Sequence, residues 1–192
     1  MSIYYYIGAN KELPLGSREK KKIDNGYDVD YPPKVIKIKN CRISEGEVPL
    51  EEIIDMSKFK PSEIEEYETR VDAAGIHIHD VFWAHSKIKK HFKSKYIYEL
   101  SPEFGNFWLS QKLMELDDEC YLVNKKCVEE LFKFIEENLD ENEEIEIYCC
   151  WDSEEEMPRK KELDWIININ SFEIGDYFEL KNKQYIIISR TS

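Results

Sequence analysis

The most regular hydrophobic pattern in the chain lies in residues 124–139. Its apolar positions recur every three or four residues, which places them in one stripe along a helix. These positions are Val128, Leu131, Phe132, Ile135 and Leu139. On the polar side Glu129 precedes Lys133 by four residues, the favourable order for an ion pair within a helix. The pattern therefore predicts an amphipathic helix over 124–139.

Downstream of this segment the pattern changes from helical spacing to alternation. In 145–151 and 163–169 apolar residues occupy every second position, and 177–180 and 184–189 are short aromatic and β-branched runs. Such segments are typical of strands. Residues 181–183 are predicted as a tight turn between the last two. Four consecutive strands predict a C-terminal meander packed against helices, and the predicted fold class is α+β with a largely antiparallel sheet.

The first hundred residues mix the two patterns. Strands are predicted over 3–7, 34–41, 76–83 and 95–100, and short helices over 49–56 and 86–93. Ser62 and Glu65 have capping-box spacing, so a helix is predicted from Ser62 to a stop at Gly75. Another is predicted after Pro102, with Leu116 turned inward. Residues 9–33 show no period and are predicted as a long loop.

Length and composition refine this picture. At 192 residues the chain is predicted to form one α+β domain over 1–192, with a possible N-terminal subregion, 1–100, and an acidic C-terminal subregion, 101–192. An apolar content of 42% is too high for a disordered chain. No apolar run approaches the ~20 residues of a membrane span, and no signal peptide is predicted. The five cysteines lack a secreted spacing pattern, so a cytoplasmic location is expected.

Charge is distributed unevenly along the chain. Residues 1–100 contain 17 basic and 17 acidic side chains, whereas residues 101–192 contain 10 and 23, so the net charge of −13 belongs to the second half. Phosphate contacts need Lys and Arg, so neither double-stranded nucleic acid nor an anionic membrane is an expected partner. An acidic surface attracts basic proteins or cations. The simpler interpretation is that the charge only keeps the protein soluble.

Acidic residues are concentrated on both sides of the predicted strand 145–151. The candidate binding surface consists of Glu143, Glu144, Asp152, Glu154, Glu155 and Glu156. Small acidic proteins neutralise basic toxins and nucleases through such surfaces, by steering and by paired charges. The leading hypothesis is a non-catalytic cytosolic interaction protein that binds a basic protein partner, as a toxin-immunity or counter-defence protein does. An excess of Ile over Ala, 23 to 4, and of Lys over Arg, 22 to 5, indicates AT-rich codons and a bacterial or phage origin.

All four histidines occur between residues 77 and 91. On a strand, His77 and His79 point one way and Asp80 the other. The candidate metal ligands are His77, His79, Asp80 and His85. Residues 74–79 resemble the strand ending in His-x-His with which amidohydrolases and related phosphoesterases begin their metal sites. The resemblance implies a metal-dependent hydrolase as an alternative function, although it covers only about six residues and no histidine follows His91 to complete the site.

A basic segment follows the first histidines. Residues 81–98 contain no carboxylate, and Lys87, Lys90 and Lys93 recur at helical spacing as a candidate anion-binding set. A third function is therefore a module that binds an anionic small ligand, although no glycine-rich phosphate loop accompanies it. Alternation places Cys149 on the buried side of its strand, where a thiol is inert. No motif specifies a reaction, and no cofactor is expected.

Overall fold

The computed structural model describes residues 2–18, 35–38, 64–67, 69–81 and 85–190. In these ranges a seven-stranded sheet runs in the order β2-β5-β6-β1-β8-β11-β9, and two ribbons pair β3 with β4 and β7 with β10. The strands are β1 (Ile3–Ala9), β2 (Gly16–Arg18), β3 (Val35–Ile38), β4 (Ile64–Tyr67), β5 (Gly75–Asp80), β6 (Tyr96–Glu103), β7 (Trp108–Leu109), β8 (Glu144–Trp151), β9 (Trp165–Asn168), β10 (Phe178–Glu179) and β11 (Tyr185–Ser189). The helices are α2 (Arg70–Ala73), α3 (His85–Ile88), η3 (Lys89–His91), α4 (Gln111–Leu116), α5 (Asp118–Asn138) and η4 (Lys161–Leu163).

The sheet is mixed and mostly antiparallel, which confirms the predicted α+β class. Among the described strands, β9 and β11 alone pair in parallel. The four C-terminal strands do not follow one another as a meander, because β11 lies between β8 and β9 while β10 leaves to pair with β7. Burial explains the order. β11 has buried residues on both of its faces and takes an interior position, whereas β9, with Ile166 73% exposed, takes the edge.

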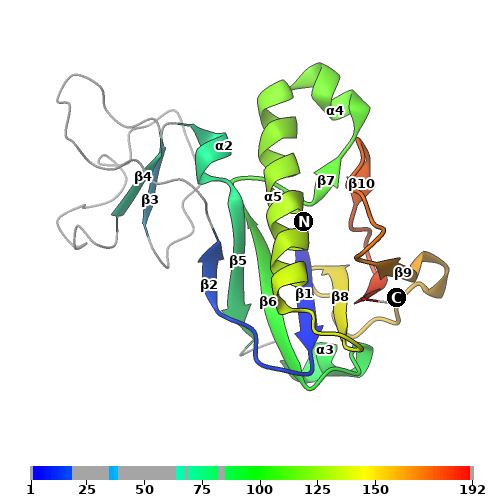
Figure 1. Ribbon diagram of the computed structural model, residues 1–192. Coiled ribbons are helices and arrows are strands. Elements are labelled where there is room, and N and C mark those ends of the chain that lie inside the picture. The colour runs from blue at the N-terminus through cyan, green and yellow to red at the C-terminus, as the bar shows by residue number, and fades with distance from the viewer. Residues whose placement is uncertain (1, 19–34, 39–63, 68, 82–84, 191–192) are drawn as a thin grey trace, which may run out of the picture.

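Helix α5 covers one face of the sheet (Figure 1). Its buried stripe includes the apolar residues predicted for it, and it packs on the alternate residues Ile7, Ile147 and Ile186 of three neighbouring strands. The helix begins at residue 118, earlier than predicted, because Asp117 accepts a hydrogen bond from the Cys120 amide at 2.9 Å and caps it. This face is the larger apolar core of the described chain.

The opposite face carries a row of tyrosines and is called here the tyrosine face. It is formed by Tyr4, Tyr6, Tyr148 and Tyr185. Helices α3 and η3 cover part of it, with Ile88 and Phe92 packed among the rings. Gly8 permits this approach, since a Cβ at that position would lie 2.6 Å from the Phe92 ring. The sheet therefore has two packed sides of different chemistry.

Two predictions about helices are wrong. The helix predicted from Ser62 is replaced, where it is described, by strand β4 and the short helix α2, because residues 64–67 pair with β3. Leu116 is not inward but 75% exposed, because α4 ends there and Asp117 directs the chain straight into α5. The helix predicted over 49–56 lies outside the described residues. None of the described helices has the length and apolar character needed to cross a membrane.

Candidate functional site

The predicted acidic surface is divided by the fold. Glu143 and Glu144 lie at the start of β8, whereas Asp152 to Glu156 follow its end. A strand of eight residues separates the two groups by roughly 23 Å, at about 3.3 Å per residue. These carboxylates therefore do not converge into one negative region.

The loop after β8 is also less acidic on its surface than its sequence indicates. Glu155 is only 2% exposed, and its carbonyl accepts a hydrogen bond from His91 Nε2 at 2.8 Å. Glu154 accepts from Asn182 at 2.9 Å and lies 3.0 Å from Lys183 Nζ, and these contacts hold the pKa of its carboxyl below the usual range. Asp152 and Glu156 are exposed and can face a partner. The prediction that Glu155 belongs to the binding surface is wrong, because this residue is buried.

The histidines of β5 form a polar cluster with neighbouring strands. The rings of His77 and His79 stack with centroids 3.8 Å apart, as expected for residues on one face of a strand. His77 Nδ1 lies 2.7 Å from Ser17 Oγ, and Ser17 donates to Glu103 Oε1 at 3.0 Å. Ser17 and Glu103 both lie beside Nδ1 of His77. The three residues therefore do not form a relay in which a base activates the serine. The cluster ties β2, β5 and β6 together.

Of the other predicted metal ligands, Asp80 does not join this cluster. Asp80 is exposed at the end of β5, and His85 begins α3. Among the residues that the structure describes, no group of three or more His, Cys, Asp or Glu side chains is placed to hold a metal ion. The metal-site hypothesis therefore has no ligand set in these parts of the chain.

The basic segment makes hydrogen bonds within the protein itself. Lys90 Nζ donates to the Glu156 carbonyl at 2.5 Å. The amide of Lys93, together with that of Ser94, donates to the buried carboxylate of Glu146 at 2.7–3.1 Å. The Lys87 side chain is exposed. Lys90 thus uses its ammonium group, and Lys93 its backbone amide, to join this segment to neighbouring parts of the chain.

The two adjacent cysteines of β8 are buried on opposite faces of the sheet. Cys149 is 1% exposed, as predicted, and Cys150 is fully buried. Burial raises the pKa of the Cys150 thiol to about 12, with further contributions from Glu155 and Glu154. Burial likewise raises the pKa of Cys149. A thiol that stays protonated is a poor nucleophile, so neither cysteine is placed for catalysis.

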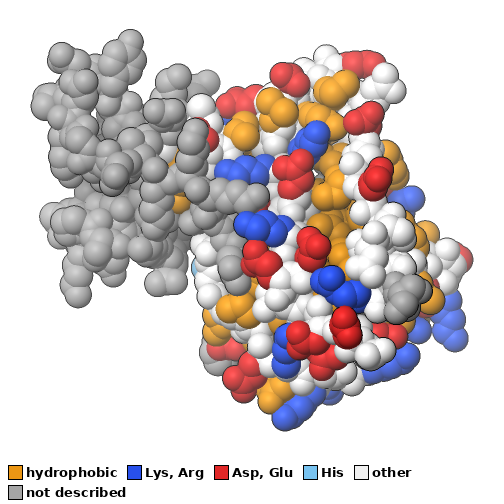
Figure 2. Space-filling view, viewed as in Figure 1, with side chains coloured by type: hydrophobic (Ala, Val, Ile, Leu, Met, Phe, Trp, Pro, Cys, Tyr) orange, Lys and Arg blue, Asp and Glu red, His pale blue; other side chains and the backbone are white. Residues whose placement is uncertain are grey.

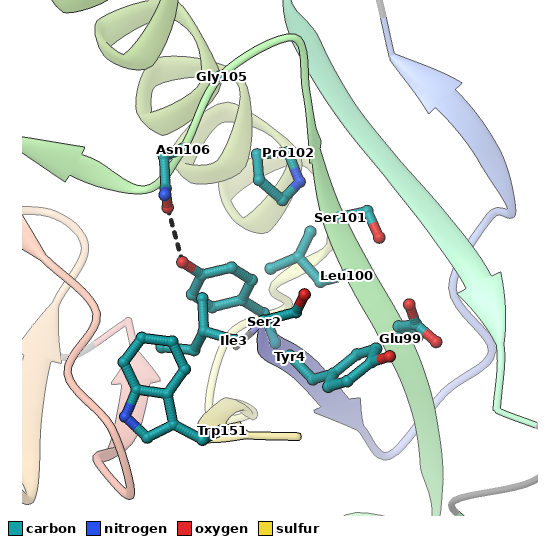
Figure 3. Close-up of a pocket in the computed structure, with 11 residues that line it drawn as sticks. Ser2, Ile3, Tyr4, Glu99, Leu100, Ser101, Pro102, Gly105, Asn106 and Trp151 are labelled. Atoms are coloured by element: carbon teal, nitrogen blue, oxygen red, sulfur yellow. Dashed lines mark hydrogen bonds between the residues drawn. The ribbon is translucent and has the colours of Figure 1, made fainter. Parts of the chain in front are cut away.

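A cavity of about 490 Å³ lies between the start of β1 and the end of β6. The two strands pair as far as Tyr5 and Leu100 and then separate, at Pro102, which has no amide hydrogen to donate. The principal polar and aromatic residues of the wall are Ser2, Tyr4, Tyr5, Glu99, Asn106 and Trp151. Figure 3 shows Asn106 and Glu99 on opposite sides, with the Tyr4 side chain pointing toward Glu99. Sequence reasoning missed this site because its residues come from three strands and a connection.

The connection behind the cavity is tightly constrained. A Cβ on Gly105 would lie 2.8 Å from Val123 Cγ1 on α5, so only glycine fits there without displacement. Phe104, directly before it, has a φ of 61°, an unfavourable conformation for an aromatic residue. Asn106 is held by Tyr5 Oη, which donates to Asn106 Oδ1 at 2.7 Å. This wall of the cavity is consequently fixed in position.

A second surface lies where α4 meets α5 and is called here the helix corner. Helix α4 has no buried residue, and Met114, Leu116 and Leu122 are 40%, 75% and 42% exposed. The carboxylates that accompany them are exposed and are those of Glu115, Asp117, Asp118 and Glu119. Figure 2 shows hydrophobic and acidic side chains interleaved over this end of the molecule. In the sequence, the signal was the run of four acids within 115–119 between large apolar residues.

The chain was compared with known protein families, with curated proteins and with solved structures. None of the three comparisons finds a match.

Proposed function

We propose that the chain is a non-catalytic interaction protein that binds a basic protein partner, of the kind that neutralises a toxin or counteracts a defence system. The observation that carries this proposal is the helix corner. There, three large apolar side chains are exposed beside four carboxylates. The negative half of the chain thus supplies both the charge and the apolar contact area of the binding surface.

The composition of the helix corner fits a protein partner better than simple solubility does. A soluble surface gains nothing from a leucine that is 75% exposed, whereas the centre of a protein interface is apolar and its rim polar. Asp118 and Leu122 lie four residues apart on α5 and therefore share one helix face. Carboxylates beside apolar anchors accelerate encounter with a basic partner and disfavour acidic ones.

The first test removes charge from the helix corner while keeping the cap of α5. In the triple variant Glu115→Lys, Asp118→Lys, Glu119→Lys, Asp117 is left in place because it caps the helix. The variant should retain basic proteins from a bacterial lysate at least about tenfold less well than the wild type, as quantified by mass spectrometry. Leu116→Ala should also weaken retention, because it removes an apolar anchor without changing the charge.

A matched control carries the same charge change at the other end of α5. The triple variant Glu136→Lys, Glu141→Lys, Glu144→Lys alters exposed carboxylates far from the helix corner. It should retain the partners at the wild-type level. Equal losses in the two triple variants would show that only net charge matters, and unchanged retention in both would contradict binding at the corner. Thermal melts of each variant separate loss of binding from loss of folding.

A further inference from the structure

We infer that two copies of this chain associate by pairing their β9 strands antiparallel, so that two seven-stranded sheets become one continuous sheet. Strand β9 is the last strand of the sheet, beyond β11, and lies at the right of Figure 1. The inference goes beyond the proposed function and does not depend on it, because no residue of the helix corner takes part.

The outer side of β9 presents backbone groups that can pair with another strand. The Ile169 amide donates to the Ser189 carbonyl at 3.0 Å, so the polar groups of Ile169 face β11. In a parallel ladder, successive residues direct their amide and carbonyl groups alternately to the two sides. Ile167 and Trp165 therefore also face β11, whereas the amide and carbonyl of Ile166 face outward. Among the described residues, neither of these two groups has a hydrogen-bond partner.

The sequence of β9 lacks the features that keep edge strands from pairing with another chain. Natural edges carry a lysine, a proline or a bulge for this purpose. Strand β9 reads Trp-Ile-Ile-Asn, and its pairing with β11 is continuous over all four residues. At the opposite edge, β2 is three residues long and ends at the charged residue Arg18. We therefore expect β9 to be the edge that accepts a strand.

Exposed apolar side chains accompany these backbone groups on both faces of the sheet. Ile166 is 73% exposed on the tyrosine face, where it pairs with Ile187 of β11. Trp165 is 40% exposed on the α5 face. A second β9 placed alongside brings Ile166 against the partner's Ile166, with Ile187 of each copy on the outside. Cross-strand contacts between such β-branched residues stabilise a sheet.

The charges on either side of β9 identify the added strand as a second copy. Before β9, residues 159–164 contain three basic and two acidic side chains, a net charge of +1. After it, residues 169–176 contain Glu173 and Asp176 and no basic side chain, a net charge of −2. In an antiparallel pair related by a two-fold axis, the basic segment of each copy lies beside the acidic segment of the other. The edge is thus complementary to itself, whereas a uniformly basic strand would match one end alone.

Ile166 also determines the register of the pair. A two-fold axis between the two copies of Ile166 lets the amide of each donate to the carbonyl of the other, as in a hydrogen-bonded antiparallel pair. Trp165 of each copy then lies opposite the partner's Ile167. Because the paired segment is short, we expect a reversible dimer with a dissociation constant of about 1–100 µM.

The first test measures the mass of the full chain by analytical ultracentrifugation over about 1–500 µM. The mass should rise from that of one copy to that of two. Hydrogen exchange followed by mass spectrometry should show the peptide that contains Ile166 exchanging more slowly at the highest concentration than at the lowest. A one-copy mass at every concentration would overturn the inference, even if a different protein protected the same peptide.

Variants at the edge locate the interface. Ile166→Pro removes the outward amide hydrogen but no bond to β11, so it should abolish the dimer while the sheet is kept. Ile166→Lys places two like charges at the two-fold axis and should weaken association at least about tenfold. Leu116→Lys, the same change at a residue that is 75% exposed on the helix corner, should leave association unchanged. If Ile166→Pro fails to fold, Ile166→Lys still decides, and wild-type association of that variant would contradict the interface.

A cross-link tests the register. In a chain whose Cys41 and Cys120 are replaced by serine, Ile166→Cys places two thiols across the two-fold axis. Their Cα atoms would lie about 5.5 Å apart, which is within the range for a disulfide. Oxidised glutathione should therefore convert most of the dimer to a covalent dimer. Leu116→Cys in the same background should remain uncoupled, and equal cross-linking of the two would contradict this register.

A charge exchange tests the identity of the added strand. Lys160→Glu together with Lys161→Glu should weaken the dimer about three- to tenfold, because acidic segments then meet at both ends of the pair. Both lysines are exposed, as are Glu173 and Asp176. Addition of Glu173→Lys and Asp176→Lys to the same chain should restore wild-type association. Failure of this fourfold variant to recover would contradict the antiparallel pairing of two copies.

Discussion

The two faces of the central sheet are packed by different means. Against α5, alternate residues such as Ile147 contact other apolar side chains, and their arrangement is specified by volume. On the tyrosine face, the adjacent residue Glu146 is 1% exposed and accepts hydrogen bonds from the amides of Lys93 and Ser94, just after η3, and from Tyr185. One face is therefore maintained by burial of apolar area, and the other by satisfaction of buried polar groups.

This difference has a consequence for tolerance to change. Apolar cores accept many substitutions of similar volume, whereas a buried polar group loses its full contribution when one partner is removed. The tyrosine face is also where the loop after β8 and η3 meet, through His91 and the Glu155 carbonyl. We therefore expect that removing one polar atom on the tyrosine face lowers stability more than removing one methyl group on the α5 face. Removing a whole apolar side chain should lower stability most.

The largest effect should come from Ile147→Ala on the α5 face. The side chain is 1% exposed in the middle of β8, and its removal leaves a cavity against α5. Unfolding free energy should fall by about 2–5 kcal/mol, measured by urea denaturation. Ile147→Val should cost only about 0.5–1.5 kcal/mol. Similar losses for both substitutions would mean that volume is not what specifies this face.

Glu146→Gln should follow, with a loss of about 1.5–3 kcal/mol in the same assay. The substitution keeps one acceptor oxygen but turns an NH₂ group toward backbone amides that need acceptors, at 2.7–3.1 Å in the wild type. The exposed Glu144→Gln, two residues earlier on the same strand, should change stability by less than about 0.5 kcal/mol. An unchanged unfolding free energy in Glu146→Gln would contradict the idea that hydrogen bonding of buried polar groups organises the tyrosine face.

A smaller effect, with a pH signature, is expected for His91→Gln. Burial lowers the pKa of His91 from 6.5, partly opposed by its hydrogen bond to the Glu155 carbonyl. The unfolded chain therefore binds a proton more readily than the folded one, so the wild type should lose stability as the pH falls below about 6.5. At pH 7.5 the variant should be less stable by about 1 kcal/mol, through the lost hydrogen bond. The difference in stability between the wild type and the variant should be smaller in acid, and thermal melts at pH 7.5 and 5.5 measure it.

The smallest effect has the opposite sign. The Tyr6 hydroxyl is buried and has no hydrogen-bond partner among the described residues, whereas the Tyr185 hydroxyl donates to Glu146. Tyr6→Phe should therefore be neutral or stabilise by up to about 1 kcal/mol, while Tyr185→Phe should destabilise by about 1 kcal/mol or more. Comparison of the two denaturation midpoints decides. A clear loss in Tyr6→Phe would reveal an unseen acceptor for its hydroxyl.

Much of the secondary structure could be predicted because its signals are local. Helix α5 and strands β1, β5, β6 and β8 follow from helical spacing or from alternation that nearby residues display. Strand order could not be predicted in this way. The placement of β11 beside β8 depends on pairs such as Ile186 with Ile147, which lie far apart in the sequence. Likewise, the pairing of β4 with β3 overrides the helical signal that begins at Ser62.

The candidate sites show the same division. The residues of the helix corner lie within one segment, so their composition was visible in the sequence, but the exposure of Leu116 depends on the absence of a loop between α4 and α5. Glu99, Tyr4 and Trp151 lie on three strands, and only their register brings them around one cavity. In contrast, Glu154 to Glu156 looked like a charged surface because sequence does not reveal hydrogen bonding to Asn182 or burial of Glu155.

The position of β11 also governs the order in which the sheet can be assembled. Strand β9 is synthesised before β11, yet its only partner in the described sheet is β11, which follows it by some twenty residues. Until β11 has docked on β8, the apolar residues Trp165 and Ile166 have no neighbouring strand to pair with. The nascent chain therefore exposes an unpaired apolar segment for a short time, until β11 docks on β8.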